Sequence, residues 1–232
     1  MTAWVDTWPT MRDEAHFGDR VVRCFSERPL SMLELLHQAV QRNPDGEALV
    51  CGDERLSYRQ LVERSRRLAG GMARHGVARG DRVALLLGNR IEFVLVLFAA
   101  AHLGAISVPI STREQAPGLA YMLNHCGARL VVHEAELGGL LPDSGAAPAL
   151  QVRVAVGESA GSETFASLLT DDLVPPVAPV GEEDTRSSCT PRVPPDGPRA
   201  QCRRNWASCI SRCISRSRWA WGRATAQLPR CR

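Results

Sequence analysis

The strongest constraint on the fold is a continuous apolar run from Val83 to Leu87, which follows the turn-like segment Arg79-Gly80-Asp81. A strand with one face in water alternates apolar and polar residues, whereas a strand covered on both faces is apolar throughout, as in a parallel sheet. A helical stretch from about Arg90 to Leu103 and a short apolar stretch, Ile106 to Pro109, come next. A strand, a helix and a strand of these lengths predict a right-handed βαβ unit.

Further elements of the same kinds are expected on both sides of this unit. They comprise a short hairpin (Ala48 to Cys51 with Arg55 to Ser57), a helix around Gly118 to His125, strands Leu130 to His133 and Val152 to Val156, and a helical turn at Phe165 to Leu169. Together they indicate an α/β domain with a mostly parallel sheet and flanking helices.

Two helices before the βαβ unit carry end signals. Ser31 is placed to cap a helix that Asn43-Pro44 ends. Ser57 and Gln60 have the spacing of a capping box, in which the serine oxygen accepts the third helical amide and the glutamine bonds the cap residue in return. The helix that follows should stop at Gly76.

The composition changes abruptly near Thr185. Residues 1–185 contain 17 Arg, 24 Asp and Glu and no Lys, a net charge of −7, whereas residues 186–232 contain 11 Arg and one acid, Asp196, a net charge of +10. Residues 1–28 show no clear period, and Val174 to Asp184 is rich in Pro and acids, as in a surface loop. We therefore divide the chain into an N-terminal extension (1–29), an α/β domain (30–185) and a basic tail (186–232).

Composition also excludes some protein classes. The apolar content of 44% is enough for a core, which excludes wholesale disorder. The most apolar stretch, Ile91 to Ala101, is far shorter than the roughly 20 residues that span a bilayer. Met1 to Thr10 lacks the pattern of a signal peptide. Cys24, Cys51 and Cys126 are scattered, which fits a reducing compartment, so a cytoplasmic protein is expected.

No residue of the first 185 has a spacing that assigns it to catalysis, to a cofactor or to a metal. We interpret the histidines as surface or packing residues, Cys51 and Cys126 as small apolar side chains, and Asp81 as a turn residue. Arg113 and Glu114 follow a strand end, where ligand sites of α/β proteins gather, but a solvated loop is the better interpretation. The histidines considered are His37, His75, His102, His125 and His133.

The tail invites two further interpretations. Its five cysteines suggest zinc, but they form no Cys-x-x-Cys pair and the tail has no histidine; they are Cys189, Cys202, Cys209, Cys213 and Cys231. Its arginines, with Trp206, Trp219 and Trp221, suggest nucleic-acid binding, because Arg neutralises phosphate and aromatic rings stack on bases. We expect weak, salt-sensitive association with polyanions and no specific site.

The α/β domain contains four short motifs in a fixed order: Leu56-Ser57-Tyr58, Gly80-Asp81-Arg82-Val83, Asn89, then Gly104-Ala105 followed by Pro109. Their order and spacing resemble the opening segment of the adenylate-forming superfamily, and the helix and strand after Asn89 are most similar to its acyl-CoA synthetase branch. The resemblance covers about residues 30 to 185. It implies the first subdomain of the AMP-binding fold.

The resemblance also implies a reaction for an intact relative. A carboxylic acid attacks the α-phosphate of ATP, with Mg2+, to give an acyl-adenylate, and coenzyme A then displaces AMP. A Gly-rich phosphate loop should follow Glu183-Asp184-Thr185, since only small residues let backbone amides approach the phosphate oxygens. Residues 186–202 contain no such loop, and the chain has no lysine. We therefore assign no catalytic, cofactor or metal residue and expect no cofactor for this chain.

A shifted reading frame accounts for the tail. When the third base of each codon is joined to the first two of the next, Arg186 to Cys202 permits Val-Ile-Leu-Tyr-Thr-Ser-Gly-Thr-Thr-Gly-Arg-Pro-Lys-Gly-Ala-Met, sixteen consecutive residues of the missing loop. Arg218 to Arg232 permits Met-Gly-Leu-Gly-x-Gly-Asp-x-x-x-Ala-Ala-Val-Pro, which also resembles the superfamily. We interpret residues 186–232 as an out-of-frame, disordered tail.

Two hypotheses result. The first is a truncated, inactive fragment of an ATP-dependent carboxylic acid–CoA ligase of fatty acid metabolism, without the phosphate loop, the downstream aromatic-Gly-x-Thr-Glu segment or the C-terminal domain with its catalytic lysine. Its intact relative would take a carboxylic acid, ATP and CoA as partners. The alternative is a stand-alone α/β binding module whose Arg-rich tail associates with polyanions.

Overall fold

A computed structural model describes residues 10–16, 18, 20–169, 176–179 and 184. The tail 186–232, with its expected disorder, lies outside the described residues, as does most of the loop predicted at Val174 to Asp184. Of that loop, residues 176–179 have no regular structure, and Val177 is exposed.

The core of the fold is a five-stranded sheet in the order β6-β5-β7-β8-β9, and each pair of neighbours in it is parallel. The strands are β5 (Arg82–Leu86), β6 (Ile106–Pro109), β7 (Ala128–Glu134), β8 (Val152–Val156) and β9 (Glu163–Thr164). The expected parallel α/β sheet is confirmed. The two residues of β9 were not anticipated, because so short a strand leaves no pattern.

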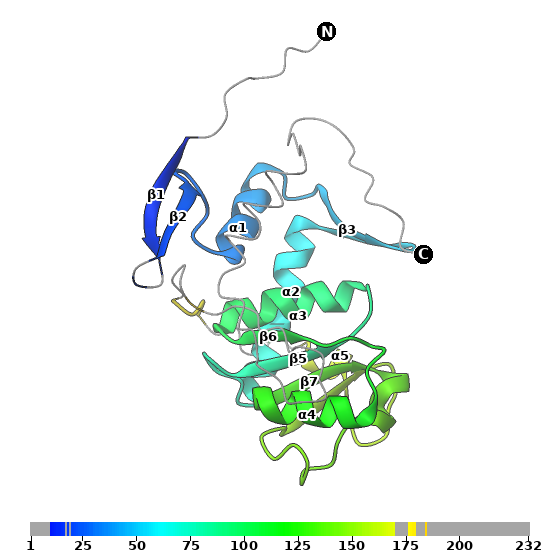
Figure 1. Ribbon diagram of the computed structural model, residues 1–232. Coiled ribbons are helices and arrows are strands. Elements are labelled where there is room, and N and C mark those ends of the chain that lie inside the picture. Colours follow the sequence, from blue (N-terminus) through cyan, green and yellow to red (C-terminus); the bar gives the residue numbers. More distant parts are fainter. Residues whose placement is uncertain (1–9, 17, 19, 170–175, 180–183, 185–232) are drawn as a thin grey trace.

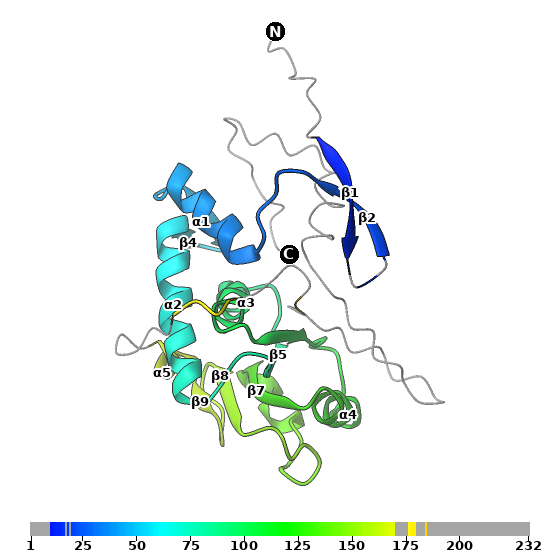
Figure 2. The ribbon, with the colours of Figure 1, turned by 90° about the vertical axis from the view of Figure 1, so that its left-hand side faces the viewer.

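Helices cover both faces of this sheet (Figure 2). One face carries α2 (Tyr58–Arg74), α3 (Ile91–Leu103) and α5 (Phe165–Leu168), while α4 (Ala116–Cys126) and the 3-10 helix η1 (Ala135–Leu140) belong to the other. Alternate residues of β5 pack into the two hydrophobic clusters on opposite faces of the sheet. Val83 and Leu85 face α2 and α3, and Ala84 and Leu86 face α4. All four are almost completely buried, which explains why β5 is apolar throughout.

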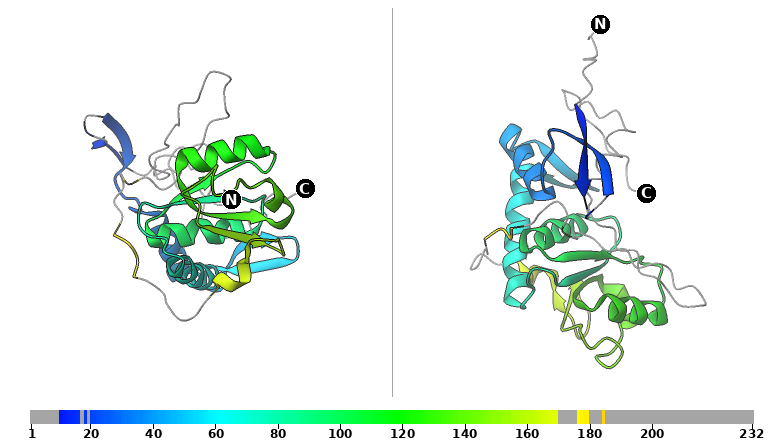
Figure 3. Two further views of the ribbon diagram at one scale, coloured as in Figure 1. Left: turned by 90° about the horizontal axis from the view of Figure 1, so that it is seen from below. Right: turned by 60° about the vertical axis from the view of Figure 1, so that its left-hand side comes forward.

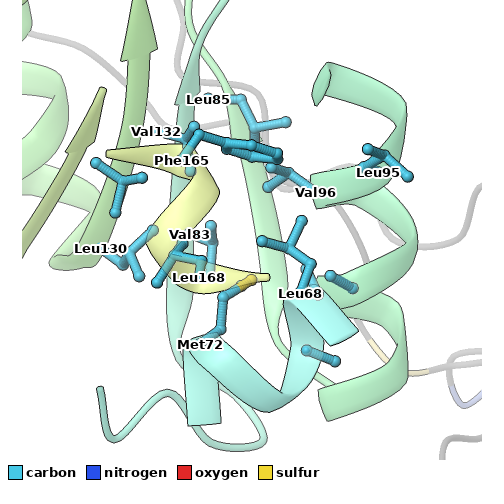
Figure 4. Packing of buried hydrophobic residues seen from close by; sticks show 14 of the residues in the cluster. Leu68, Met72, Val83, Leu85, Leu95, Val96, Leu130, Val132, Phe165 and Leu168 are labelled. Carbon is cyan, nitrogen blue, oxygen red and sulfur yellow. The ribbon is translucent and has the colours of Figure 1, made fainter. Parts of the chain in front are cut away.

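The larger cluster joins side chains from several elements (Figure 4). Leu68 and Met72 of α2, Val96 of α3 and Leu168 of α5 are fully buried there against the sheet. Helix α5 packs against α2 (Figure 3). This layer therefore ties residues 58–74 to residues 165–168.

The predicted helix ends are confirmed. The Ser31 hydroxyl accepts the Glu34 amide at 3.1 Å at the start of α1 (Met32–Arg42), whose C-cap is Asn43. Both bonds of the Ser57 and Gln60 capping box are present before α2. After α2, Gly76 has a φ of 77°, a left-handed conformation that favours glycine and stops the helix. The predicted hairpin is β3 (Glu47–Cys51) with β4 (Glu54–Ser57).

One expectation was wrong: residues 1–28 are not irregular throughout. Strands β1 (Met11–His16) and β2 (Arg20–Phe25) form an antiparallel hairpin. It stands apart from the α/β body (Figure 1). Its pattern escaped the sequence analysis because charged residues lie on both faces, Asp13 and Arg23 on one and Arg12 and Glu14 on the other.

Candidate functional site

The topology identifies one edge of the sheet as the place for a ligand. The chain passes from β5 to β6 on one side and then to β7 on the other side of β5. The carboxyl ends of β5 and β7 therefore form a topological switch point, where open α/β sheets bind their ligands. Residues 87–90 follow β5 at this point, and Glu134 ends β7.

The switch point is occupied by a side chain of the protein itself. The Glu134 carboxylate accepts the backbone amide of Gly88 at 2.9 Å through Oε1, and its Oε2 pairs with the Arg90 guanidinium. Arg90 also donates to Glu92 from Nε at 2.9 Å. The four residues form one network of two carboxylates, one guanidinium and one amide, in which each charge has an opposite partner.

This network does not fit a nucleotide phosphate. A backbone amide beside an arginine is a donor set that anions prefer, but Glu134 already takes both donors. Burial alone would lower the pKa of Arg90, yet the hydrogen bonds and charges of Glu92 and Glu134 outweigh it and raise that pKa. Arg90 and Glu134 therefore form an ion pair within the chain that joins the loop after β5 to the end of β7.

His133 precedes Glu134 in β7, and its side chain is completely buried. Its Nδ1 lies 2.7 Å from the Glu134 carbonyl oxygen, which can only accept, and its Nε2 lies 2.9 Å from the Ser162 hydroxyl. Nδ1 therefore donates to the carbonyl oxygen, and in the neutral ring Nε2 accepts from the hydroxyl. Burial is the main cause that lowers the pKa of His133. The structure thus places His133 in the packed interior, whereas its lack of a catalytic role stays a prediction.

The structure does not bring the five histidines together. His37 lies exposed on α1, His75 caps the end of α2 and pairs with Glu163, His102 is buried in α3, and His125 stacks on Tyr121 of α4. Cys51 and Cys126 are half-buried rather than fully buried, and each packs against one of the two core clusters. Burial raises the pKa of the Cys126 thiol.

The remaining candidates are turn and loop residues. The Asp81 carboxylate accepts the Ala78 amide at 2.9 Å, which shapes the turn before β5 as expected. Arg113 is exposed in the loop after β6, and Glu114 is half-buried beside it. Asp184 pairs with Arg79 at 3.2 Å, so the last described residue lies near the amino end of β5. None of these residues joins the network at the carboxyl ends.

The hairpin holds a cluster that the sequence analysis missed. One ligand atom each of Glu14, His16 and Cys24 lies within 4.8 Å of the other two. Hydrogen bonds from Arg28 and then from Arg12 hold the pKa of the Glu14 carboxyl well below its usual range. The spacing of Glu14 and His16, two residues apart, would have placed both on one face had a strand been recognised here.

No helix in the part of the chain that the structure describes is both long and apolar enough to cross a membrane.

Comparison with known proteins adds a family. The model of the family described as AMP-binding enzyme matches residues 36–194. A medium/long-chain-fatty-acid–CoA/3-oxocholest-4-en-26-oate–CoA ligase of Mycobacterium marinum is 35% identical over 119 residues, 50% of this chain and 22% of the relative. The long-chain-fatty-acid–CoA ligase FadD13 of Mycobacterium tuberculosis is 41% identical over 83 residues, 36% of this chain and 16% of the relative. The chain thus matches less than a quarter of the length of these relatives.

A solved structure agrees with the sequence relatives. The fatty acyl CoA synthetase of Mycobacterium tuberculosis superposes with a TM-score of 0.63 and 26% identity, over 73% of this chain and 34% of that one. The fold described above is therefore found within a chain about three times as long as the matched part.

Proposed function

We propose that residues 30–185 are the first subdomain of a fatty acyl-CoA ligase, because this chain belongs to the AMP-binding enzyme family. We further propose that the phosphate loop of this ligase is read out of frame after Thr185. Such a chain makes no acyl-adenylate. The observation that carries the proposal is the contrast between the family match over residues 36–194 and the tail sequence, which permits the loop only in the shifted frame.

The names of the relatives support the substrate class. Both sequence relatives named above are fatty-acid–CoA ligases, 35% and 41% identical to this chain over the matched residues. Intact members of the branch use ATP, Mg2+ and coenzyme A. We propose a fatty acid as the substrate of the restored enzyme and no cofactor for the present chain.

The described residues support the absence of adenylation. The reaction needs donors placed around the transferring phosphoryl oxygens at the same time. At the switch point the amide of Gly88 and the guanidinium of Arg90 are taken by Glu134, and lysine is absent from the whole sequence. In the shifted frame the tail would supply both a Gly-rich loop and a lysine in the segment Arg186 to Cys202.

The test compares two forms of the gene. One base is inserted before codon 186 in a gene that keeps the DNA downstream of codon 232, so that the new frame can continue into the remaining motifs. The insertion changes the frame to the one that permits the loop, while residues 1–185 keep their identity. Both products are purified and assayed for exchange of labelled pyrophosphate into ATP with a fatty acid present. We expect no exchange from the present chain and fatty-acid-dependent exchange from the restored product. Exchange catalysed by the 232-residue chain itself would refute the proposal.

The alternative is a binding module, and the net charge of +10 in residues 186–232 is the observation that favours it. Binding to heparin at several salt concentrations distinguishes the two. Counterion release gives a steep salt dependence without preference among polyanions. A preference for one polyanion that persists at high salt would favour a selected binding function for the tail.

For the compartment we propose the cytoplasm. Cys51 and Cys126 are free thiols in the described part of the chain, which supports a reducing environment.

A further inference from the structure

We propose that the hairpin β1–β2 carries a site for one divalent transition-metal ion of the zinc type, with Glu14, His16 and Cys24 as its protein ligands. The hairpin precedes residues 36–194, which the family model matches, so the site is separate from the proposed ligase fold. Its basis is the convergence of three different ligand atoms within 4.8 Å of one another.

The register of the hairpin brings the three side chains to one face. Successive residues of a strand point to opposite faces, so Glu14 and His16 share a face with Arg12. Arg12 pairs directly with Cys24 across the hairpin, and directly paired residues point to the same side. The backbone therefore fixes the grouping, and only side-chain rotation is left to adjust.

The separations match those around a tetrahedral ion. His16 Nε2 lies 3.1 Å from Glu14 Oε2 and 3.8 Å from Cys24 Sγ. Metal–ligand bonds of about 2.0–2.3 Å at tetrahedral angles place the ligand atoms about 3.3–3.6 Å apart. The third separation, between Glu14 and Cys24, is within 4.8 Å, so rotation of these side chains would seat an ion between the three atoms, with a fourth position left for water.

The same distances argue against a catalytic cysteine. A nucleophile, a base and an orienting carboxylate need the two different nitrogens of the histidine ring. Here His16 approaches Glu14 and Cys24 with the same nitrogen, Nε2, so one atom would have to serve both of them at once. Three ligand atoms that converge on one position can bind an ion, whereas a proton relay needs its groups arranged in sequence.

Arg28 holds the carboxylate ligand in place. Its Nη1 and Nη2 donate to Oε1 and Oε2 of Glu14 at 3.1 and 2.5 Å, and Arg12 donates to Oε1. A carboxylate offers about four lone-pair sites. These bonds use three of them, and the fourth, on Oε2, meets His16 Nε2 at 3.1 Å, where the ion would take the place of this contact. Carboxylate ligands of metals are commonly held by such outer partners.

The donor set selects the kind of metal. Thiolate and imidazole are ligands of zinc and of the later first-row ions, whereas magnesium and calcium take oxygen ligands only. The side chains of His16 and Glu14 are 12% and 17% exposed, so the proposed metal site is partly shielded from solvent yet open to an entering ion. Zn2+ and its spectroscopic substitute Co2+ are therefore the ions to test.

The experiment uses the full 232-residue chain with the five tail cysteines changed to serine, because those thiols would bind metal on their own. Co2+ is titrated and the thiolate-to-cobalt charge-transfer band is recorded. Zn2+ is then added in competition. We expect one Co2+ per chain, displaced by Zn2+. In the same background, Cys24→Ser should abolish the band, and His16→Gln should weaken binding by more than the roughly 10- to 100-fold that loss of an outer partner costs.

Matched controls carry the same substitutions away from the cluster. Cys51→Ser and His37→Gln should leave both the band and the affinity unchanged. Alkylation provides a readout that needs no variant of the cluster: Zn2+ should protect Cys24 from iodoacetamide and leave the labelling of Cys51 unchanged. The proposal is overturned if the chain binds no Co2+, if the band survives Cys24→Ser, or if Zn2+ does not slow the alkylation of Cys24.

Discussion

The Glu134 carboxylate accepts the Gly88 amide at 2.9 Å, so the residue that ends β7 closes the loop that follows β5. The two residues lie at the switch point of the sheet, where related folds receive a ligand. The protein thus places its own anion where an amide and the Arg90 guanidinium would otherwise attract one from solution. This contact fixes two neighbouring strands at their carboxyl ends.

Removal of Glu134 should therefore cost stability. Glu134→Ala leaves the Gly88 amide without its acceptor and Arg90 without one of its two carboxylates, and we expect a loss of about 1–3 kcal/mol in the free energy of unfolding. Glu134→Gln keeps an oxygen for the amide and should lose less, about 1 kcal/mol. Urea unfolding measures both changes. Glu158→Ala, at an exposed position, is the control, and an equal loss there would contradict the interpretation.

Gly71 marks a close approach of two segments. A Cβ at this position of α2 would lie 2.0 Å from the backbone oxygen of Leu168, so α5 would have to move. Although alanine favours a helix by about 1 kcal/mol over glycine, Gly71→Ala should still destabilise the fold by about 1–3 kcal/mol. Thermal unfolding tests this. Gly139→Ala, with no atom within 4 Å of the added carbon, should have little effect.

The elements found from the sequence are those whose pattern is local. Strand β5 is apolar because both of its faces are buried, and the caps at Ser31 and Ser57 depend on residues three positions away. The hairpin β1–β2 has no such pattern: it is a charged ribbon in which Arg28 reaches back to Glu14, fourteen residues away. Polar contacts of this kind leave no periodicity to detect.

The network at the switch point escaped prediction for a different reason. The strand was expected to end at His133, and one further residue, Glu134, carries the ion pair. Its partner Gly88 is 46 residues away in the sequence. The contact depends on the register that sets Leu86 of β5 opposite His133 of β7, and single-sequence patterns do not specify the register between parallel strands. The sequence therefore predicted that β5 and β7 are buried, but not that Glu134 pairs with Gly88 and Arg90.

The capping box of α2 offers a quantitative test of a predicted feature. The Ser57 hydroxyl accepts the Gln60 amide at 3.3 Å, and the Gln60 side chain accepts the Ser57 amide at 2.9 Å. Ser57→Ala should destabilise the protein by about 0.5–2 kcal/mol, whereas Ser57→Asp keeps a side-chain acceptor and should retain most of the stability. Denaturant unfolding of the two variants side by side checks the order. Equal losses would show that the cap bond contributes nothing.

The buried His133 should make stability depend on pH. Burial, with a smaller effect of the Arg153 charge, lowers its pKa below the ordinary value, while the Glu134 carbonyl and charge oppose the shift. The unfolded chain therefore binds a proton more readily, with a pKa of about 6.5, than the folded chain. By linkage, the contribution of His133 to the free energy of unfolding is fully present above about pH 6.5 and is lost as pH falls towards the folded pKa.

His133→Gln should flatten the fall in melting temperature over that pH range. Because a glutamine side chain cannot fill the site equally well, the variant should melt lower throughout. His125→Gln, at an exposed position of α4, should keep the wild-type slope. Titration of the folded protein by NMR gives the independent measurement: a His133 imidazole that protonates at or above about pH 6.5 would contradict the prediction, because no proton difference would then favour the unfolded chain.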